Sequence, residues 1–413
     1  MTTAEHLWQA ALDSVETYLS DIMAAIRPLP PREIGLADAL GAVLVADVTA
    51  QWPLPSFDNS AMDGYAVRAS ELAGASAETP IVMPVHGEIA AGDTSTRDLV
   101  PGSVIKITTG APLPAGADAV VPVELTDGGT GRVAIRQPVA AGSAIRRAGD
   151  DARPGDLLLQ AGTRLGAVHL GLLAAAGHAA VLARPRPRVM VISTGNELVE
   201  PGTALVPGQI WESNATMLAA AAREAGCAAV RHPIVPDSTT AVLAAVGDAL
   251  DSTDLLITSG GVSMGGEHDV VKAALATLGT VDFRKVAMQP GMPQGFGTVG
   301  PAATPIFTLP GNPVSAYVSF CLFVRPALDA LQDYFPERGK PAQAVLTEPV
   351  RSPAEKRSFL RGILDQAAGL VTPVSGQASH RLASLARANA LVIVPEQVTS
   401  LDAGACVDVL ELP

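Results

Sequence analysis

The segment that decides the fold is residues 255–266, which read LLITSGGVSMGG. Residues 255–258 are apolar enough to form a buried strand, and apolar spacing over residues 269–278 predicts a helix after the loop. The glycines from Gly260 to Gly266 let backbone N–H groups approach an anion, and the helix N-terminus adds a dipole worth about 0.3–1 kcal/mol. The segment therefore predicts a strand, a loop that binds the phosphate of a small ligand, and a helix.

The same alternation of strand and helix continues on both sides of this segment. Apolar runs predict strands over residues 189–192, 229–235, 255–258 and 306–309. Helical spacing predicts helices over residues 215–225, 240–250, 269–278 and 314–331. Because such alternation is typical of parallel sheets with helices on both faces, we expect an α/β domain with a doubly wound, mostly parallel sheet.

Three of the predicted strand ends carry glycines, prolines and hydroxyl groups. A single loop of this kind is more typical of a tight turn, but ligands of doubly wound sheets bind outside the carboxyl ends of the strands. Three such loops at one edge therefore favour a binding site. The candidate ligand-binding residues are Ser193, Thr194, Gly195, Ser259, Gly260, Gly261, Ser263, Pro310, Gly311, Asn312, Pro313 and Ser315.

Residues 261–265 also match the G-x-S-x-G nucleophile elbow of serine hydrolases, with Ser263 as the nucleophile. An elbow needs a triad acid and then a histidine later in the same domain. His268 lies only five residues further on, and His380 lies in another predicted domain. A hydrolase is therefore the less favoured alternative.

Charged residues near the same edge predict a metal site and an oxyanion site. Glu197, Asp237 and Asp269 are oxygen ligands that suit Mg²⁺, although Asp237 and Asp269 are also in positions typical of helix caps. Lys285 and Arg361, together with Arg284, are candidate cations for an oxyanion, although each one alone is more typical of surface charge.

Composition excludes several classes of function. The chain has 413 residues and a net charge of −13, which argues against bulk binding of nucleic acid or anionic membranes. No apolar run approaches the ~18 residues of a membrane-spanning helix, and the polar N-terminus does not resemble a secretory signal. The three cysteines are far apart in the sequence, so we expect reduced thiols and a cytoplasmic protein.

Changes in the sequence pattern along the chain predict four parts. Residues 1–51 and 141–183 contain helices and connecting segments, and residues 52–140 have the short strands and turns of a β-rich inserted module. Residues 184–337 form the α/β domain, which begins with RPRPR (184–188), a sequence typical of a stiff linker. Residues 338–413 return to short strands and predict a small β-barrel-like domain.

Several motifs together resemble the molybdopterin molybdenumtransferase family, which includes the gephyrin E-domain. The resemblance runs nearly end to end, and its most specific part is the segment FDNSAMDGYA at residues 57–66. The other matching segments are residues 108–112, 145–151, 193–198, 259–269, 309–315, 359–362 and 379–380.

This resemblance implies an elongated, dimeric subunit whose α/β domain is of the molybdopterin-binding type. It implies that adenylylated molybdopterin, made by molybdopterin adenylyltransferase, loses AMP and receives molybdate with the help of Mg²⁺. It also implies an active-site cleft shared between two subunits. The family's site residues map to Asp58, Thr109, Asp151, Glu197, Asp237, Asp269, Lys285, Pro310, Pro313, Arg361 and Ser379.

We therefore expect a transferase of molybdenum cofactor biosynthesis. Its expected catalytic residues are Asp58, Thr109, Glu197, Asp237, Asp269, Lys285 and Arg361, and Asp237 and Asp269 are the expected metal ligands. Two departures leave alternatives open, because Gln289 and Met292 stand where many relatives carry lysines. A paralogue with altered metal preference, such as tungstate, or a pterin-binding scaffold without catalysis would also fit.

Overall fold

The computed structural model describes residues 12–94, 97–261, 270–277, 280–335 and 341–412. Contacts divide the chain into two compact units. Unit 1 comprises Met1–Arg32, Gly41–Val43 and Leu182–Pro413, and unit 2 comprises Glu33–Leu40 and Leu44–Val181.

A six-stranded sheet forms the centre of unit 1 within the described residues. Its order is β16 (Ala228–Arg231), β13 (Arg188–Ser193), β17 (Leu255–Ser259), β21 (Thr304–Leu309), β20 (Pro293–Val299) and β18 (Val281–Lys285). The first four strands are parallel, and β20 and β18 are antiparallel to their neighbours. The predicted doubly wound, mostly parallel sheet is confirmed.

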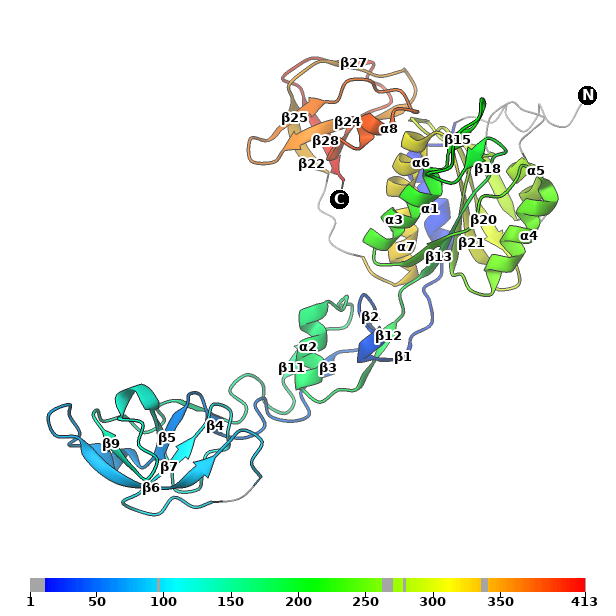
Figure 1. Cartoon of the computed structure of the whole chain (residues 1–413). Helices are drawn as coiled ribbons and strands as arrows, with labels where there is room; N and C mark the ends of the chain where they lie inside the picture. The colour runs from blue at the N-terminus through cyan, green and yellow to red at the C-terminus, as the bar shows by residue number, and fades with distance from the viewer. Residues whose placement is uncertain (1–11, 95–96, 262–269, 278–279, 336–340, 413) are drawn as a thin grey trace, which may run out of the picture. The chain divides into compact units, whose positions relative to one another are not determined.

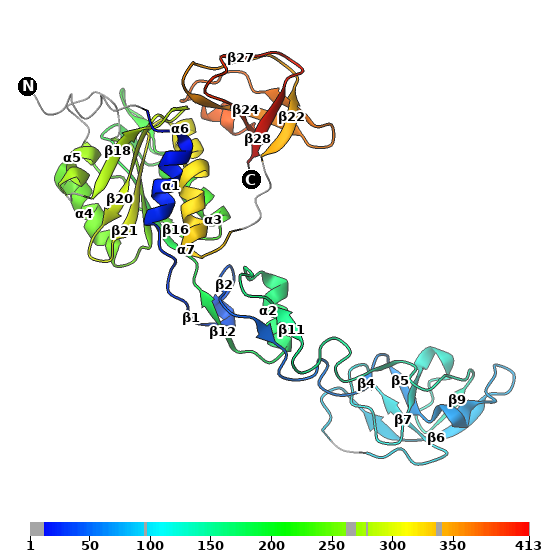
Figure 2. The ribbon, with the colours of Figure 1, turned by 180° about the vertical axis from the view of Figure 1, so that it is seen from behind.

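Helices cover both faces of this sheet (Figures 1 and 2). On one face lie α4 (Thr239–Leu250) and α5 (Val270–Ala276), which pack on Ile192, Leu256 and Ile306. On the other face lie α1 (Val15–Ala25), α3 (Asn214–Glu224), α6 (Pro313–Ser319) and α7 (Arg325–Leu331). Predicted and observed helices agree within one or two residues where described, but the strand predicted over 229–235 already ends at Arg231.

The helical segment Pro313–Leu331 is continuous through a π-helical turn, Phe320–Val324. By length and composition it could cross a membrane, and 72% of its apolar window is buried in the described structure. Its apolar residues include Val318, Phe323 and Leu328, which pack in the same core as the sheet. Core packing therefore explains its hydropathy.

Helix α1 packs on the α/β sheet although it precedes that sheet by more than 160 residues. The Tyr18 ring meets the Phe323 ring edge to face at 4.9 Å, and Arg284 Nη1 pairs with Asp21 Oδ2 at 2.5 Å. Ser14 caps the helix by accepting a hydrogen bond from Thr17 N. The sequence-based grouping of residues 1–51 with 141–183 did not anticipate this packing.

The C-terminal part of unit 1 is a closed five-stranded barrel within the described residues, as the sequence predicted. The strands are β24 (Arg357–Asp365), β25 (Leu370–Pro373), β22 (Ala342–Leu346), β28 (Cys406–Glu411) and β26 (Ala390–Val394), and β26 pairs back to β24. The short helix α8 (Leu382–Leu385) lies between β25 and β26 in the chain, and β19 (Met288–Gln289) pairs in parallel with the start of β24. The paired short strands β23 (Val350–Arg351) and β27 (Ser400–Leu401) complete this part.

A further strand pair, β14 (Leu198–Val199) with β15 (Ile210–Trp211), belongs to the α/β part of unit 1.

Unit 2 contains a five-stranded sheet in its described part. The order is β8 (Ala119–Pro122), β5 (Gly64–Val67), β7 (Val104–Ile107), β6 (Ile81–Ile89) and β9 (Arg132–Ile135). Two strand pairs accompany it, β4 (Asn59–Ser60) with β10 (Ile145–Arg146) and β3 (Val48–Thr49) with β11 (Leu157–Leu159), together with helix α2 (Ala167–Ala175). Strands β1 (Arg32–Gly35), β12 (Ala180–Arg184) and β2 (Val43–Leu44) form a separate small sheet in that order.

Candidate functional site

The three glycine- and proline-rich loops meet at one edge of the sheet in unit 1. Thr194 N donates to Ser259 O at 3.2 Å, which joins the loop after β13 to the end of β17. Gly260 N donates to Leu309 O at 3.2 Å, which joins the loop after β17 to the end of β21. The predicted ligand-binding residues in these loops therefore lie side by side.

The turn at Gly260 requires glycine. Its φ is +98°, and a Cβ atom there would lie 2.8 Å from the carbonyl oxygen of Thr194. Gly311 approaches so closely that its Cβ position would be 3.6 Å from Gly260 Cα. The loops are thus packed backbone to backbone at the carboxyl ends of the parallel strands.

Asn214, at the start of α3, ties two of these loops together. Its Nδ2 donates to Ser259 Oγ at 2.8 Å and to Gly311 O at 2.7 Å. Sequence reasoning missed this residue because it started the helix at Ala215. An amide directly before an apolar helical run is the signal that could have identified it.

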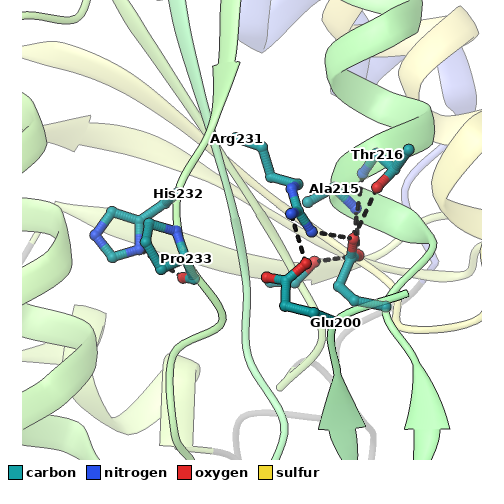
Figure 3. A network of polar contacts seen from close by, with 8 residues as sticks. Glu200, Ala215, Thr216, Arg231, His232 and Pro233 are labelled. Carbon is teal, nitrogen blue, oxygen red and sulfur yellow. Dashed lines mark hydrogen bonds and ion pairs between the residues drawn. The ribbon is translucent and has the colours of Figure 1, made fainter. Parts of the chain in front are cut away.

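A buried carboxylate, Glu212, supports the first turn of α3. Its side chain is only 1% exposed, and Oε1 accepts from Ser193 Oγ at 2.9 Å and from Ala215 N at 2.6 Å. Arg231 joins this network and also pairs with Glu200, whose Oε2 lies 2.6 Å from Arg231 Nη2 (Figure 3). The sequence pattern did not identify Glu212 as a site residue either.

The predicted acids Glu197 and Asp237 are exposed at this edge. Asp237 Oδ2 accepts from Asn196 N at 3.0 Å, and Asn196 Oδ1 accepts from Asp237 N at 3.1 Å. The Glu197 carboxylate folds back against Gly195, where a Cβ atom would lie 2.7 Å from Oε2. Among the residues that the structure describes, no group of three acidic, histidine or cysteine side chains could hold a metal ion.

Two predicted residues, Ser263 and Asp269, lie outside the described residues. The same holds for most of the G-x-S-x-G motif, of which Gly261 alone is described. The structure therefore bears neither on a nucleophilic Ser263 nor on Asp269 as a metal ligand.

The C-terminal barrel brings Ser379 and Arg361 to unit 1's candidate site. Asn312 Nδ2 donates to Ser379 Oγ at 3.1 Å, and Val314 N donates to Ser379 O at 3.1 Å. Arg361 is 1% exposed, and its Nη2 donates to Gly376 O at 2.8 Å, three residues before Ser379.

No carboxylate in the described part of the chain pairs with Arg361, and its Nε has no hydrogen-bond partner there. Burial, followed by the nearby charge of Arg381, lowers the pKa of the Arg361 guanidinium. A buried cation without a counter-ion is costly, so this position favours an anionic ligand.

The two neighbouring cations of β18 have different surroundings. Lys285 is the last residue of β18 and pairs with Pro293 of β20. Two residues further along β20, Gly295 pairs with Thr308 of β21. This register places Lys285 at the same edge as the loop after β21. Arg284 instead forms ion pairs with Asp13, Asp21 and Asp282. Of its two predicted roles, ordinary surface charge therefore fits Arg284 better than a cation that binds an oxyanion.

In unit 2, the segments that contain Asp58 and Thr109 converge. Arg147 Nη1 donates to Asp58 Oδ2 at 2.6 Å, and Ala148 N donates to Asp58 Oδ1 at 2.8 Å. Hydrogen bonds from Ala148 and from Arg147 lower the pKa of the Asp58 carboxyl. Gly110 N donates to Ser60 O at 2.8 Å and so holds the two segments together.

Thr109 is held by a carboxylate that the sequence reasoning did not single out. Thr109 N and Thr109 Oγ1 both donate to Asp63 Oδ1, at 2.6 and 2.9 Å. The backbone hydrogen bond, followed by the hydroxyl hydrogen bond, lowers the pKa of Asp63. Unit 2 therefore presents two fixed carboxylates and a threonine on one group of loops.

Three family models match consecutive parts of the chain. Residues 13–177 match the MoeA N-terminal region (domain I and II), residues 190–330 match a probable molybdopterin binding domain, and residues 343–412 match the MoeA C-terminal region (domain IV).

Relatives of known name match over nearly the whole length. Molybdopterin molybdenumtransferase 2 of Mycobacterium tuberculosis (strain ATCC 25618 / H37Rv) is 48% identical over 404 residues, which cover 95% of this chain and 97% of the relative. Molybdopterin molybdenumtransferase of Bacillus subtilis (strain 168) is 38% identical over 385 residues, which cover 91% and 89%. A crystal structure of the molybdopterin biosynthesis moea protein from Pyrococcus horikosii superposes with a TM-score of 0.73 at 32% identity and covers 97% of this chain and 98% of the other.

Proposed function

The chain belongs to the molybdopterin molybdenumtransferase family, and from this premise we propose that it takes adenylylated molybdopterin, releases AMP and inserts molybdate at the dithiolene. It is a transferase of molybdenum cofactor biosynthesis, since relatives with that name share 38–48% of their residues with it over nearly their full length.

The observation that carries the proposal is the convergence of three loops at one sheet edge of unit 1, together with a buried arginine. The hydroxyls of Ser259, at the end of β17, and of Ser315, in α6 after β21, suit phosphate and molybdate oxygens as ligands. Arg361 adds a buried positive charge without a carboxylate partner in the described residues. This combination favours a ligand with two oxyanion groups.

Lys285 and Arg361 act as oxyanion clamps in the proposed reaction. Lys285 ends β18 at the same sheet edge as these loops, and Arg361 binds Gly376 O, three residues before Ser379, which Asn312 holds. The two cations hold the phosphate groups and the incoming molybdate while the bond to AMP breaks. The surrounding loops contain the other expected ligand-binding residues, which are Ser193, Thr194, Gly195, Pro310, Asn312, Pro313 and Ser379.

Mg²⁺ fits the carboxylates at the same edge. Glu197 and Asp237 are exposed acids beside the phosphate loops, and Mg²⁺ prefers one or two carboxylates together with phosphate oxygens and water. Asp237 and Asp269 would hold it, and the bound ion would neutralise charge on the leaving phosphate. Asp237 is already oriented by its reciprocal hydrogen bonds with Asn196.

We further propose a homodimer in which Asp58 and Thr109 of one subunit face the α/β domain of the other. The fixed carboxylates of unit 2 support this idea, because hydrogen bonds hold Asp58 and Asp63 on one group of loops beside Thr109. A molybdopterin adenylyltransferase would supply the substrate. The four-part domain division and the cytoplasmic location stay predictions.

A second candidate rests on Gln289 and Met292. Gln289 lies in β19 opposite Ser358, so a lysine that many relatives carry is replaced by an uncharged amide beside the barrel. Fewer cations would weaken capture of the oxyanion, which favours a scaffold that binds the pterin without turnover or a paralogue with an altered metal, such as tungstate.

The test is molybdate-dependent AMP release from adenylylated molybdopterin. We expect activity in the wild type, and a loss of about 100-fold in kcat/KM for Lys285→Ala, because one oxyanion donor is removed. Lys356→Ala, in the loop before β24, is the matched control and should retain full activity. Full activity of Lys285→Ala would remove Lys285 from the site, and tungstate-only or absent turnover in the wild type would favour the second candidate.

A further inference from the structure

The buried carboxylate of Glu212 meets hydrogen-bond donors on every side that the structure describes. Oε1 accepts from Ser193 Oγ and Ala215 N, and Oε2 faces Thr216 N at 3.3 Å, Thr216 Oγ1 at 3.2 Å and Arg231 Nη1 at 3.4 Å. An ionised carboxylate accepts at both oxygens, whereas an amide donates from one side. This pocket is therefore built for a negative charge.

Arg231 balances that charge from the neighbouring strand. It comes from the end of β16, lies between Glu200 and the first turn of α3, and is 30% exposed (Figure 3). Breaking a buried pair from one side leaves an uncompensated charge, so the two residues depend on one another.

Through two short routes, Glu212 reaches all three loops of the candidate site. It binds the hydroxyl of Ser193 directly, at the end of β13. It also fixes the first helical turn, from which Asn214 holds Ser259 and Gly311. The side chains in the loops that would touch a ligand are thus connected to a carboxylate that does not touch it.

We propose that Glu212 is a positioning residue, whose buried charge, balanced by Arg231, holds the loops after β13, β17 and β21 in register for ligand binding. The effect of this register on turnover rests on the proposed function. The register itself is a property of the unliganded protein and can be measured without substrate.

The first measurement is amide hydrogen exchange of the unliganded protein. In Glu212→Gln, either orientation of the new amide places an NH₂ group against donors. Exchange at Thr194 and Gly260, whose amides join the loops, should therefore rise by about tenfold or more. Arg188→Met is the control, because Arg188 pairs with Asp254 at the opposite end of the same strand and its loss should leave those amides protected.

A double variant separates positioning from charge balance. Glu212→Gln with Arg231→Met removes both charges, so it also provides the measurement if the single variant does not fold. If Glu212 positions the loops, exchange at Thr194 and Gly260 stays fast in the double variant. Wild-type protection there, or in the single variant, would overturn the proposal.

Kinetics provides the second measurement. In Glu212→Gln we expect KM for the pterin substrate to rise about tenfold while kcat changes less than about threefold, because binding geometry rather than chemistry is lost. An equal loss in kcat at unchanged KM would contradict positioning. An inactive wild type would refute the proposed function, and the exchange result would still decide the role of Glu212.

Discussion

At the scale of single residues, Gly260 occupies a position of the candidate site that does not tolerate a side chain. A side chain there would collide with the carbonyl of Thr194 and would also need the left-handed φ of +98°. We expect Gly260→Ala to lower the free energy of unfolding by about 1–3 kcal/mol and to abolish most of the activity. Gly247→Ala, on α4 with nothing within 4 Å of its Cβ position, should instead stabilise by about 0.5–1 kcal/mol. Equal behaviour of the two variants in denaturant unfolding would refute the close approach of the loops.

Asp58 gives the second prediction at this scale. Its folded pKa lies below the ordinary value of 3.8, so its hydrogen bonds stabilise unit 2 above that pH, and the stabilisation is lost as the pH falls through the folded pKa. Arg147→Met should raise the pKa of Asp58 toward 3.8 and move acid unfolding to higher pH. Because the Asp58 side chain is 38% exposed, the effect should stay below about 1 kcal/mol. An NMR titration of Asp58 at or above 3.8 in the wild type would contradict the geometry.

At the scale of elements, the segment RPRPR is not a free linker, although its composition is typical of one. Arg184 pairs with Asp333, Arg188 pairs with Asp254, and Arg186 donates to Gly226 O at 3.0 Å and to Cys227 O at 2.9 Å, at the end of α3. Arg186→Met should therefore cost about 1–3 kcal/mol in unfolding free energy while KM stays unchanged. An unchanged unfolding midpoint in urea would restore the linker interpretation.

The elements that the sequence predicted are those with an uninterrupted apolar pattern. Strands β13, β17 and β21 follow from short apolar runs, and the helices between them follow from buried Ala, Val and Leu at helical spacing. Strand β20 was missed because Gly295 and Gly297 interrupt it, yet a Cβ atom at Gly297 would lie 2.1 Å from Thr280 O. Glycine there reflects close packing between strands, which a local pattern does not reveal.

The candidate site was predictable in part for a similar reason. Loops at strand ends follow from topology, so Ser193, Ser259 and Asn312 could be named from the sequence. Glu212 could not, because the local pattern does not show that Ser193, Ala215 N and Arg231 surround its carboxylate. Local sequence shows which groups are present, and tertiary contacts decide which of them are buried together.

At the scale of the whole molecule, the proposed shared cleft predicts complementation between two inactive variants. Asp58→Asn alters unit 2, and Lys285→Ala alters unit 1. If each cleft combines unit 2 of one subunit with unit 1 of the other, a co-expressed mixture should recover about a quarter of wild-type activity, because about half of the dimers carry one intact site. The separately expressed variants, mixed without subunit exchange, are the control and should stay inactive. The absence of recovery in hybrids purified through two different tags would place the whole site in one chain.

The central claim is that this chain couples AMP release to molybdate insertion. It is tested most directly by measuring AMP and pterin-bound molybdenum in the same reaction, with wild-type protein, adenylylated molybdopterin and increasing molybdate. We predict that the two products rise together in equal amounts and that AMP release stays at background without molybdate. Molybdate-independent AMP release, or binding of the pterin without release of AMP, would contradict the claim.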